Sequence, residues 1–294
     1  MHETQAKSIL SSGNGMNIYR GCSHGCIYCD ARSKCYNMQH DFEDIEIKAN
    51  AVELLEQTLR SRRNRCMIST GAMSDPYMHV EEKLCHTRRC LELIHQYGFG
   101  LAIQTKSDRI LRDLDLLKKI HAETKCVVQI TLTTYDEDLC KLIEPNVCTT
   151  KRRVEVLNIL REEGIPTVVW MTPILPFIND SEKNIRGLLD YCIEAKVYGI
   201  LTFQMGLTLR EGDREYYYSK LDKYFPGMKE KYIKYFGNDY ILPSPNSKEL
   251  LELVRKTCND NRIVADDQAI FEYMRAFEDK KSGQQINMFD FMPI

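Results

Sequence analysis

The sequence predicts an α/β protein whose core is an open barrel of six β-strand and α-helix units, followed by a helical extension. Three observations support this prediction. Apolar runs of strand length alternate with amphipathic stretches of helical length, glycines and cap residues stand between them, and the alternation ends near residue 203. Six units are too few for a complete eight-fold barrel, so we expect a partial (β/α)6 TIM-type barrel.

The expected strands are short and follow one another along the first two thirds of the chain. They are the run MNIYRGC at 16–22, then 66–70, 101–105, 126–132, 165–171 and 198–203. Between them, apolar residues recur at spacings of three, four and seven, which indicates amphipathic helices. These residues are Val52, Leu55 and Leu59; Leu84, Leu91 and Ile94; Ile110, Leu114 and Leu117; Leu157 and Leu160; and Ile185, Leu188, Leu189 and Cys192. Gly98 and Gly164 stand where two helices should end, and Ser107 and Asp180 stand where two should begin.

The composition changes after residue 204. The segment 210–236 holds six tyrosines among seven basic and five acidic residues. We therefore divide the chain into a barrel core over 1–204, a helical, Tyr-rich extension over 205–281 and an exposed tail over 282–294. The expected role of the extension is a helical cap that closes the open barrel edge, and the alternative is a surface on which unpaired bases stack.

The overall composition excludes several classes of protein. With 40 Lys and Arg against 42 Asp and Glu, no global positive field attracts the chain to nucleic acid or to an anionic membrane. No apolar run approaches the roughly 20 residues that a membrane span needs, and the start MHETQAKSIL is too polar and too short for a signal peptide. We expect a soluble cytoplasmic protein, in which the twelve Cys do not form a disulfide framework.

Three of the cysteines, Cys22, Cys26 and Cys29, lie together in the segment NIYRGCSHGCIYCDAR. A four-iron, four-sulfur cluster normally takes four Cys thiolates, so three ligands spaced CxxxCxxC leave one iron open to a small chelator. The alternatives are a zinc site with Cys35 or His24 as the fourth ligand, or a four-Cys electron-transfer cluster. Neither alternative explains the βα repeat behind the loop, which favours the open cluster.

This CxxxCxxC loop after the first strand, with an aromatic residue before the third Cys, resembles the radical S-adenosylmethionine (SAM) superfamily. The resemblance implies that the open iron binds the amino and carboxylate groups of SAM. It also implies that the reduced cluster cleaves SAM to methionine and a 5′-deoxyadenosyl radical, which abstracts hydrogen from a substrate. A reductant such as flavodoxin or ferredoxin is then an expected partner.

The resemblance narrows to the spore photoproduct lyase family of photolyase-like repair proteins. It rests on GCSHGCIYCDAR, SDPY near residue 75 with Glu81, QTKS at 104–107, IEP at 143–145 and TPILPFIND at 172–180, and it covers roughly residues 16–200. It implies a lyase-like enzyme of DNA repair whose substrate is a nucleic-acid lesion or nucleotide. There are two alternatives. One is a radical enzyme that acts on a small metabolite or a protein, and the other is a noncatalytic Fe-S or zinc protein.

Two residues depart from that family. Ala72 stands where the lyases have a Cys implicated in returning hydrogen to the product radical, which argues against the thymine-dimer reaction itself. Asp30 follows the third cluster Cys, where the relatives usually have an aromatic residue.

Candidate SAM contacts lie at the expected strand ends, because ligands gather at the C-terminal mouth of such barrels. Lys106 is the candidate partner of the SAM carboxylate, and the alternative is that it is solvated at the rim. Arg153 could pair with a carboxylate, or it could simply lie at a helix start. Hydroxyl groups are candidates for the ammonium and the ribose, although capping or rim solvation is the alternative. The candidate set is Tyr28, Ser69, Thr70, Ser74, Asp75, Lys106, Thr131, Thr133 and Arg153.

The tail contains a short run that resembles the bacterial sliding-clamp-binding peptide. Its residues are Gln285, Ile286, Met288 and Phe289. If it binds the clamp, it connects the enzyme to DNA replication or repair, and the alternative is that the tail folds back over apolar barrel surface.

Overall fold

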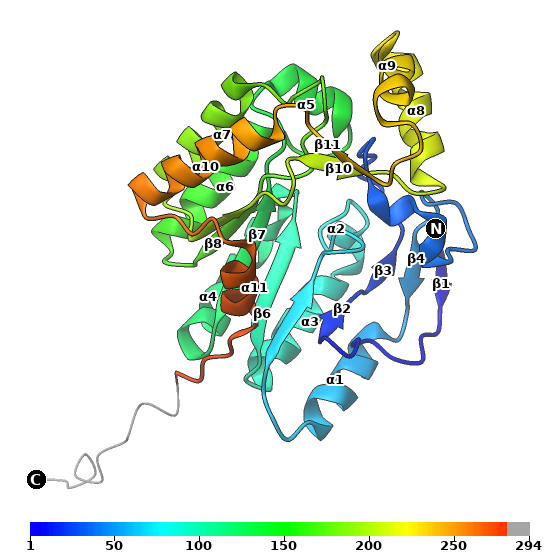
Figure 1. Ribbon diagram of the computed structural model, residues 1–294. Coiled ribbons are helices and arrows are strands. Elements are labelled where there is room, and N and C mark those ends of the chain that lie inside the picture. Colours follow the sequence, from blue (N-terminus) through cyan, green and yellow to red (C-terminus); the bar gives the residue numbers. More distant parts are fainter. Residues whose placement is uncertain (281–294) are drawn as a thin grey trace, which may run out of the picture.

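A six-stranded parallel sheet forms the centre of the protein, seen in a computed structural model that describes residues 1–280 (Figure 1). Within this sheet, each strand pairs with the next one in chain order, β2-β5-β6-β7-β8-β9, because the two strands between β2 and β5 along the chain belong to another sheet. The two edge strands, β2 and β9, do not pair with each other. The predicted partial (β/α)6 barrel is therefore confirmed. The strands are β2 (Gly15–Met16), β5 (Met67–Thr70), β6 (Gly100–Thr105), β7 (Cys126–Thr131), β8 (Thr167–Trp170) and β9 (Gly199–Leu201).

Helices cover the outer face of this sheet. Alternate strand residues such as Ile68, Val128 and Val169 pack with the buried apolar faces of the helices, because successive side chains of a strand point to opposite faces. The helices lie where the apolar spacing predicted them, with one exception. The helix expected from Leu84, Leu91 and Ile94 is divided at Cys85 into α2 and α3, and α5 is an additional short helix. They are α1 (Ala51–Ser61), α2 (Glu81–Leu84), α3 (His86–Gln96), η3 (Asp108–Asp113), α4 (Leu114–Glu123), α5 (Glu137–Ile143), α6 (Thr150–Glu162) and α7 (Glu182–Glu194).

The inner face of the sheet is filled near its lower end by the last described helix, α11 (Asp267–Arg275). Ile270 and Met274 of α11 pack on the alternate strand residues Met67, Ala102, Val127, Val168 and Leu201. Figure 1 shows α11 in front of the strands. The chain before α11 also pairs with the β9 edge, since Ile200 donates to the carbonyl of Val264 (2.9 Å). The extension thus covers both the open edge and part of the inner face, while the division of the chain at residues 204 and 281 stays a prediction.

The rest of the extension combines helices with a short strand pair. β10 (Gly206–Thr208) and β11 (Ile241–Pro243) pair antiparallel, which the composition alone did not predict. α8 (Asp213–Tyr224) and α9 (Met228–Phe236) pack against each other, and α10 (Ser247–Asn261) packs on α7. No helix within residues 1–280 is long and apolar enough to cross a membrane.

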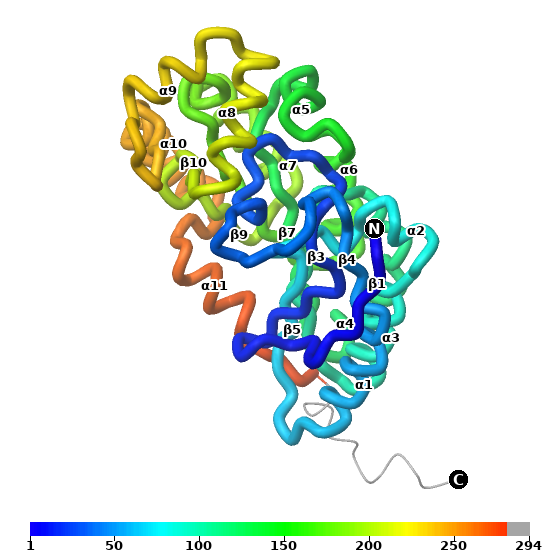
Figure 2. Tube along the Cα trace, turned by 90° about the vertical axis from the view of Figure 1, so that its right-hand side faces the viewer, coloured from blue at the N-terminus to red at the C-terminus, as the bar shows by residue number. Residues whose placement is uncertain are grey.

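A second sheet lies beside the barrel at the N-terminal side, in the order β1-β4-β3 (Figure 2). It consists of β1 (His2–Thr4), β3 (Tyr19–Arg20) and β4 (Glu46–Lys48). Two short turns of 3-10 helix, η1 (Asp30–Arg32) and η2 (Lys34–Tyr36), follow the cysteine loop.

Two of the local predictions are wrong in detail. The first expected strand, 16–22, is divided: Met16 belongs to the central sheet, whereas Tyr19 pairs with Ile47 in the second sheet. Asp180 does not cap α7. The cap is Ser181, whose hydroxyl accepts from the Asn184 amide (3.2 Å), while the Asp180 carboxylate accepts from the Ser244 hydroxyl (2.6 Å).

The other predicted boundaries are confirmed. Gly98 and Gly164 follow α3 and α6 with φ of 69° and 71°, a left-handed conformation that favours glycine. The Ser107 side chain caps η3 by accepting from the Arg109 amide.

Candidate functional site

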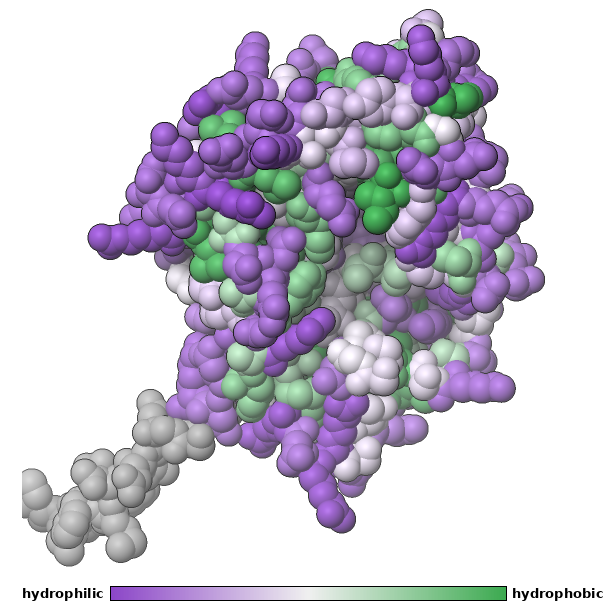
Figure 3. Space-filling model, viewed as in Figure 1, coloured by the Kyte–Doolittle hydropathy of each residue, from purple (hydrophilic) through white to green (hydrophobic). Residues whose placement is uncertain are grey.

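A cavity of about 440 Å³ opens at the C-terminal ends of the central strands. Figure 3 shows a hollow near the middle of the face that looks onto the inner side of the sheet. Eight of the twelve candidate metal- and SAM-binding residues line this cavity: Cys22, Cys26, Tyr28, Cys29, Ser74, Asp75, Lys106 and Thr131. Four others do not line it: Ser69, Thr70, Thr133 and Arg153.

The backbone of the cysteine loop is held by close contacts with two other segments. Gly21 has φ of 81°, and a Cβ there would lie 2.4 Å from the carbonyl oxygen of Phe42. The amide of Cys22 donates to the same carbonyl (3.2 Å). On the other side, Ile27 donates to the carbonyl of Ile143 (3.0 Å). The loop therefore presents its three thiols from a defined backbone path.

The three thiols lie close enough to one another for their charges to interact. Besides burial, the charges of Cys22 and Cys29 both raise the pKa of Cys26, and the charge of Cys29 raises that of Cys22. One short loop therefore brings three potential metal ligands together at the mouth of the barrel.

Burial raises the pKa of all three thiols, for Cys22 to about 12. The positive charge of Lys106 opposes this effect at Cys26 and Cys29. Because a thiol binds iron as the thiolate, cluster binding must release the protons, and Lys106 favours the charged form.

The polar side chains after β5 hold the loop in place. The Asp75 carboxylate accepts from the Thr105 hydroxyl (2.7 Å) and from the amide of Lys106 (2.9 Å), and it lies 3.4 Å from Nδ1 of His24. The Ser74 hydroxyl donates to the carbonyl of Gly21 (2.6 Å). These bonds join the ends of β5 and β6 to the cysteine loop, so Asp75 and Ser74 are engaged by the protein itself.

Three polar groups of residues that line the cavity have no hydrogen-bond or ion-pair partner in the described part of the chain: Nε2 of His24, the Thr131 hydroxyl and the Lys106 ammonium. The hydroxyl oxygen of Thr131 is buried and makes no hydrogen bond. The Lys106 ammonium lies 5.9 Å from the centre of the Tyr28 ring and has no carboxylate within ion-pair distance. Burial lowers the pKa of Lys106, but the charges of Cys26 and Glu144 outweigh it and raise that pKa. A cation and a hydroxyl are thus available to an anionic, hydroxyl-bearing ligand.

Arg153 lies beneath the cavity and is paired with a carboxylate of the protein. Its guanidinium is 2.6 Å from Glu144, and both side chains are buried. Arg153 also donates to the carbonyl of Thr131 (3.0 Å), while Glu144 accepts from the hydroxyls of Tyr28 and Thr133. This ion pair supports β7 and the cysteine loop from below.

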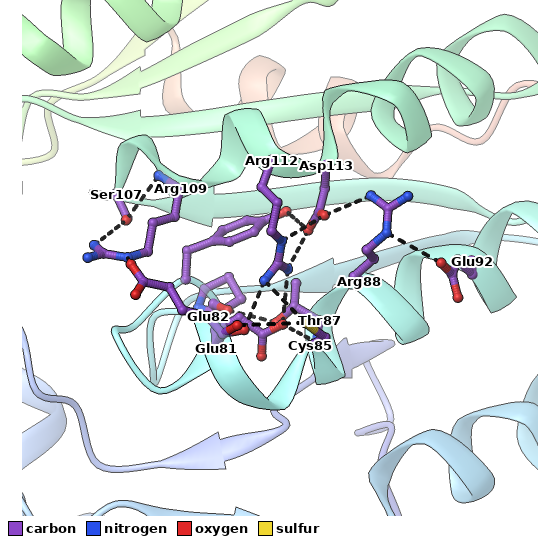
Figure 4. A network of polar contacts seen from close by, with 12 residues as sticks. Glu81, Glu82, Cys85, Thr87, Arg88, Glu92, Ser107, Arg109, Arg112 and Asp113 are labelled. Carbon is purple, nitrogen blue, oxygen red and sulfur yellow. Dashed lines mark hydrogen bonds and ion pairs between the residues drawn. The ribbon is translucent and has the colours of Figure 1, made fainter.

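A buried ionic network supports the segment between β5 and α3 (Figure 4). Arg112 lies between two fully buried carboxylates, 3.1 Å from Glu81 and 2.7 Å from Asp113. Tyr77 donates to Asp113 (3.1 Å), and Tyr19 donates to Glu81. Glu81 therefore connects the strand before the cysteine loop to the segment that carries Asp75.

Sequence reasoning missed the aromatic wall of the cavity. Trp170 and Phe203 line the cavity with their ring centres 5.7 Å apart, and the Trp170 indole donates to Gln129 (2.9 Å). Trp170 ends β8, and Phe203 follows β9. The strand-end argument that selected Lys106 applies equally to these two rings.

The comparisons with known proteins agree with this geometry. Residues 16–189 match the family model described as the radical SAM superfamily. An uncharacterized protein of Mycobacterium tuberculosis is 28% identical over 280 residues, covering 90% of this chain and 82% of that protein. An uncharacterized protein of Methanocaldococcus jannaschii is 32% identical over 169 residues, covering 57% and 62% of the two chains.

Solved structures of spore photoproduct lyase share the fold. A complex of that enzyme with dinucleoside spore photoproduct aligns with a TM-score of 0.64 at 14% identity, over 90% of this chain and 80% of the other. A double mutant with bound AdoMet and dinucleoside spore photoproduct aligns with a TM-score of 0.59 at 15% identity, over 84% and 74%.

Proposed function

This chain belongs to the radical SAM superfamily, which uses a four-iron, four-sulfur cluster and SAM. On that premise we propose that it is a radical enzyme that acts on a nucleic-acid lesion or a nucleotide. When bound, these cofactors supply a 5′-deoxyadenosyl radical that abstracts hydrogen from the substrate. The observation that carries the proposal is that three thiols, an unpaired ammonium, an unpaired hydroxyl and two aromatic rings share one cavity.

The chain's own residues divide into a metal-binding and a cofactor-binding set. Cys22, Cys26 and Cys29 would hold three irons. Lys106 would pair with the carboxylate of SAM, because a half-buried ammonium without a counterion in the described chain gains from an anion. Thr131 would bond to a ribose hydroxyl, which would satisfy its buried oxygen.

The remaining candidates take supporting roles in this proposal. Tyr28 would shield the cluster side of the cavity, with its own hydroxyl held by Glu144. Ser74 and Asp75 would position the cysteine loop through their bonds to Gly21 and Lys106. Ser69, Thr70, Thr133 and Arg153 lie outside the cavity lining, so we do not propose that they contact SAM.

The aromatic wall supports a planar, base-like substrate. Trp170 and Phe203 line the cavity together with the cysteine loop, and Phe203 remains 38% exposed. Stacking of a base on an aromatic side chain contributes about 1–3 kcal/mol and is tolerant of sequence. The fold shared with spore photoproduct lyase, which is solved with a dinucleoside photoproduct, supports the same substrate class.

Ala72 gives a reason to propose a reaction other than that of the lyase. It lines the cavity. The sequence resemblance places it where the lyase family has the Cys implicated in returning hydrogen. Among the cavity-lining residues of the described chain, the cysteines are Cys22, Cys26 and Cys29, all of which we assign to the cluster. We therefore propose that hydrogen does not return to the product from a cysteine at that position.

Anaerobic reconstitution tests the radical chemistry. We expect a brown protein with the charge-transfer absorption of a cubane cluster, which forms 5′-deoxyadenosine from SAM with dithionite. Cys26→Ala should abolish that product, and Cys66→Ala, at a half-buried cysteine outside the cavity, should not. A Cys26→Ala protein that still forms 5′-deoxyadenosine at the wild-type rate would refute the ligand assignment.

The substrate needs a separate experiment. Deuterium transfer from a labelled DNA library into 5′-deoxyadenosine would support the nucleic-acid proposal, and Trp170→Leu should reduce the transfer without reducing uncoupled SAM cleavage. Absence of transfer from any nucleic acid would favour a small metabolite or a protein. The same assay with flavodoxin or ferredoxin in place of dithionite tests the reductant.

The proposed sliding-clamp contact through Gln285, Ile286, Met288 and Phe289 lies outside the described residues. A pull-down with the clamp tests it, with Phe289→Ala as the variant that should not bind. If the clamp retained the wild type and Phe289→Ala to the same extent, the peptide assignment would be contradicted.

A further inference from the structure

We infer that His2, His40 and Glu46 form a binding site for a divalent transition-metal ion, separate from the cavity. One potential ligand atom of each residue lies within 4.8 Å of the other two. His2 and Glu46 face each other in the parallel register of β1 and β4, and His40 comes from the segment between η2 and β4. Figures 1 and 2 show β1 and β4 side by side at the N-terminal side of the molecule.

The hydrogen bonds of the two imidazoles leave one nitrogen of each ring free. Nδ1 of His2 lies 2.9 Å from the Asp44 carboxylate, and Nδ1 of His40 lies 3.0 Å from the carbonyl oxygen of Asp41. Both partners can only accept, so each Nδ1 carries the hydrogen. In the neutral rings each Nε2 then presents a lone pair, which is the form that binds metal.

The free nitrogen of His40 is directed at a carboxylate. Its Nε2 makes no hydrogen bond and lies 3.4 Å from Oε2 of Glu46. An imidazole lone pair and a carboxylate oxygen repel each other unless a cation lies between them. That cation is either a second proton on His40 or a metal ion bound by all three side chains.

The ligand set and its surroundings favour the metal ion. Two neutral imidazoles and one carboxylate are a known zinc-binding set, and the ligand distances of about 2.0–2.2 Å place neighbouring ligand atoms roughly 3.4 Å apart. The Asp44 carboxylate accepts from Nδ1 of His2, and zinc-bound histidines commonly donate their other ring N–H to a carboxylate in this way. The other oxygen of Asp44 pairs with the amino group of Met1, and Thr4 donates to Glu46 (3.2 Å).

An ion at this position would connect β1, which precedes the cysteine loop, with two segments that follow it. His40 and Asp44 flank Phe42, whose carbonyl accepts from the amide of Cys22. The ion would therefore fix the segment that returns from the cysteine loop against β1 and β4. Because it binds the folded state alone, it should also raise the unfolding temperature, with a stabilisation that grows as the logarithm of its free concentration once that exceeds the dissociation constant.

Zinc analysis of the reconstituted enzyme tests this site. The holoenzyme is equilibrated with Zn²⁺, desalted, and examined for zinc content and by X-ray absorption at the zinc edge. We expect one zinc per chain with only N and O neighbours at about 2.0–2.2 Å, whereas zinc bound by cysteines would show sulfur near 2.3 Å. His40→Ala and Glu46→Gln should lose this zinc, and Asp44→Asn should weaken its binding by about 10–100-fold.

His95→Ala is the matched control, because His95 also lies near a carboxylate, 3.3 Å from Glu123. Within the described residues, His95 is not part of a group of three potential metal ligands. It should keep the zinc. The iron content and cluster absorption of each variant report whether it is folded, and they are measured separately from the zinc. A folded wild-type holoenzyme without N/O-bound zinc, or equal zinc in wild type and both ligand variants, would overturn the inference and leave His40 protonated beside Glu46.

Discussion

Replacing Arg153 with Met tests how much the ion pair beneath the cavity stabilises the fold. Arg153 and Glu144 are 1% or less exposed and 2.6 Å apart. The Met side chain retains most of the apolar stem but leaves Glu144 without its cationic partner. Breaking a buried pair in this way costs about 3–5 kcal/mol, because an uncompensated charge remains in a water-poor site.

The neighbouring residue supplies the control. Arg152 pairs with Asp108 (2.8 Å) and Glu155 (2.6 Å), but its side chain is 42% exposed. Arg152→Met should therefore cost no more than about 1 kcal/mol. With an unfolding entropy of roughly 2.1 cal/mol/K per residue, the loss at Arg153 corresponds to a Tm decrease of about 5–8 °C.

The assay is thermal and urea unfolding of both reconstituted variants under anaerobic conditions. Burial raises the pKa of Glu144, but Arg153 and Lys106 outweigh it and lower that pKa. The stability that the Glu144 carboxylate contributes is therefore present above its ordinary pKa of about 4.3 and is lost as the pH falls through the lowered value. The gap between Arg153→Met and wild type should accordingly narrow at acid pH. If Arg153→Met were within about 1 kcal/mol of Arg152→Met at neutral pH, the reasoning would be refuted.

Three further changes have defined outcomes. Gly71→Ala should lower the free energy of unfolding in urea by about 1–3 kcal/mol, because Gly71 has φ of 100° and its Cβ would lie 2.0 Å from the Gln104 carbonyl oxygen. Gly164→Ala should lower it less, because a Cβ at Gly164 would meet no atom within 4 Å. Burial raises the pKa of Asp213 to about 6, so its protonated form stabilises the fold below pH 4 and this contribution is lost as the pH rises through 6. The Tm of Asp213→Asn should thus rise relative to wild type between pH 4 and 7, and an unchanged difference would contradict the assignment. Lys106→Met should raise the KM for SAM by roughly 10–100-fold in the deoxyadenosine assay, and an unchanged KM would exclude the carboxylate contact.

Local patterns were sufficient to predict the barrel and the cysteine loop. Strand runs such as 126–132 and the apolar spacing of Leu157 and Leu160 depend on neighbours a few residues away, so they can be read along the chain. The CxxxCxxC spacing is local for the same reason, because one short loop supplies all three thiols. Strand ends share one edge of a parallel sheet, which is why Lys106 and Thr131 could be placed together in advance.

Partners that are distant in sequence were decided only by the tertiary structure. Arg153 looked available for a ligand until the fold placed it against Glu144, and Tyr19 left the predicted first strand because β4 offered it a pairing partner. His2, His40 and Glu46 have no recognisable spacing, yet the pairing of β1 with β4 brings them together. A buried charge or an unpaired backbone group takes whichever partner the packed chain brings within reach, and long-range packing, which no short segment encodes, determines that partner.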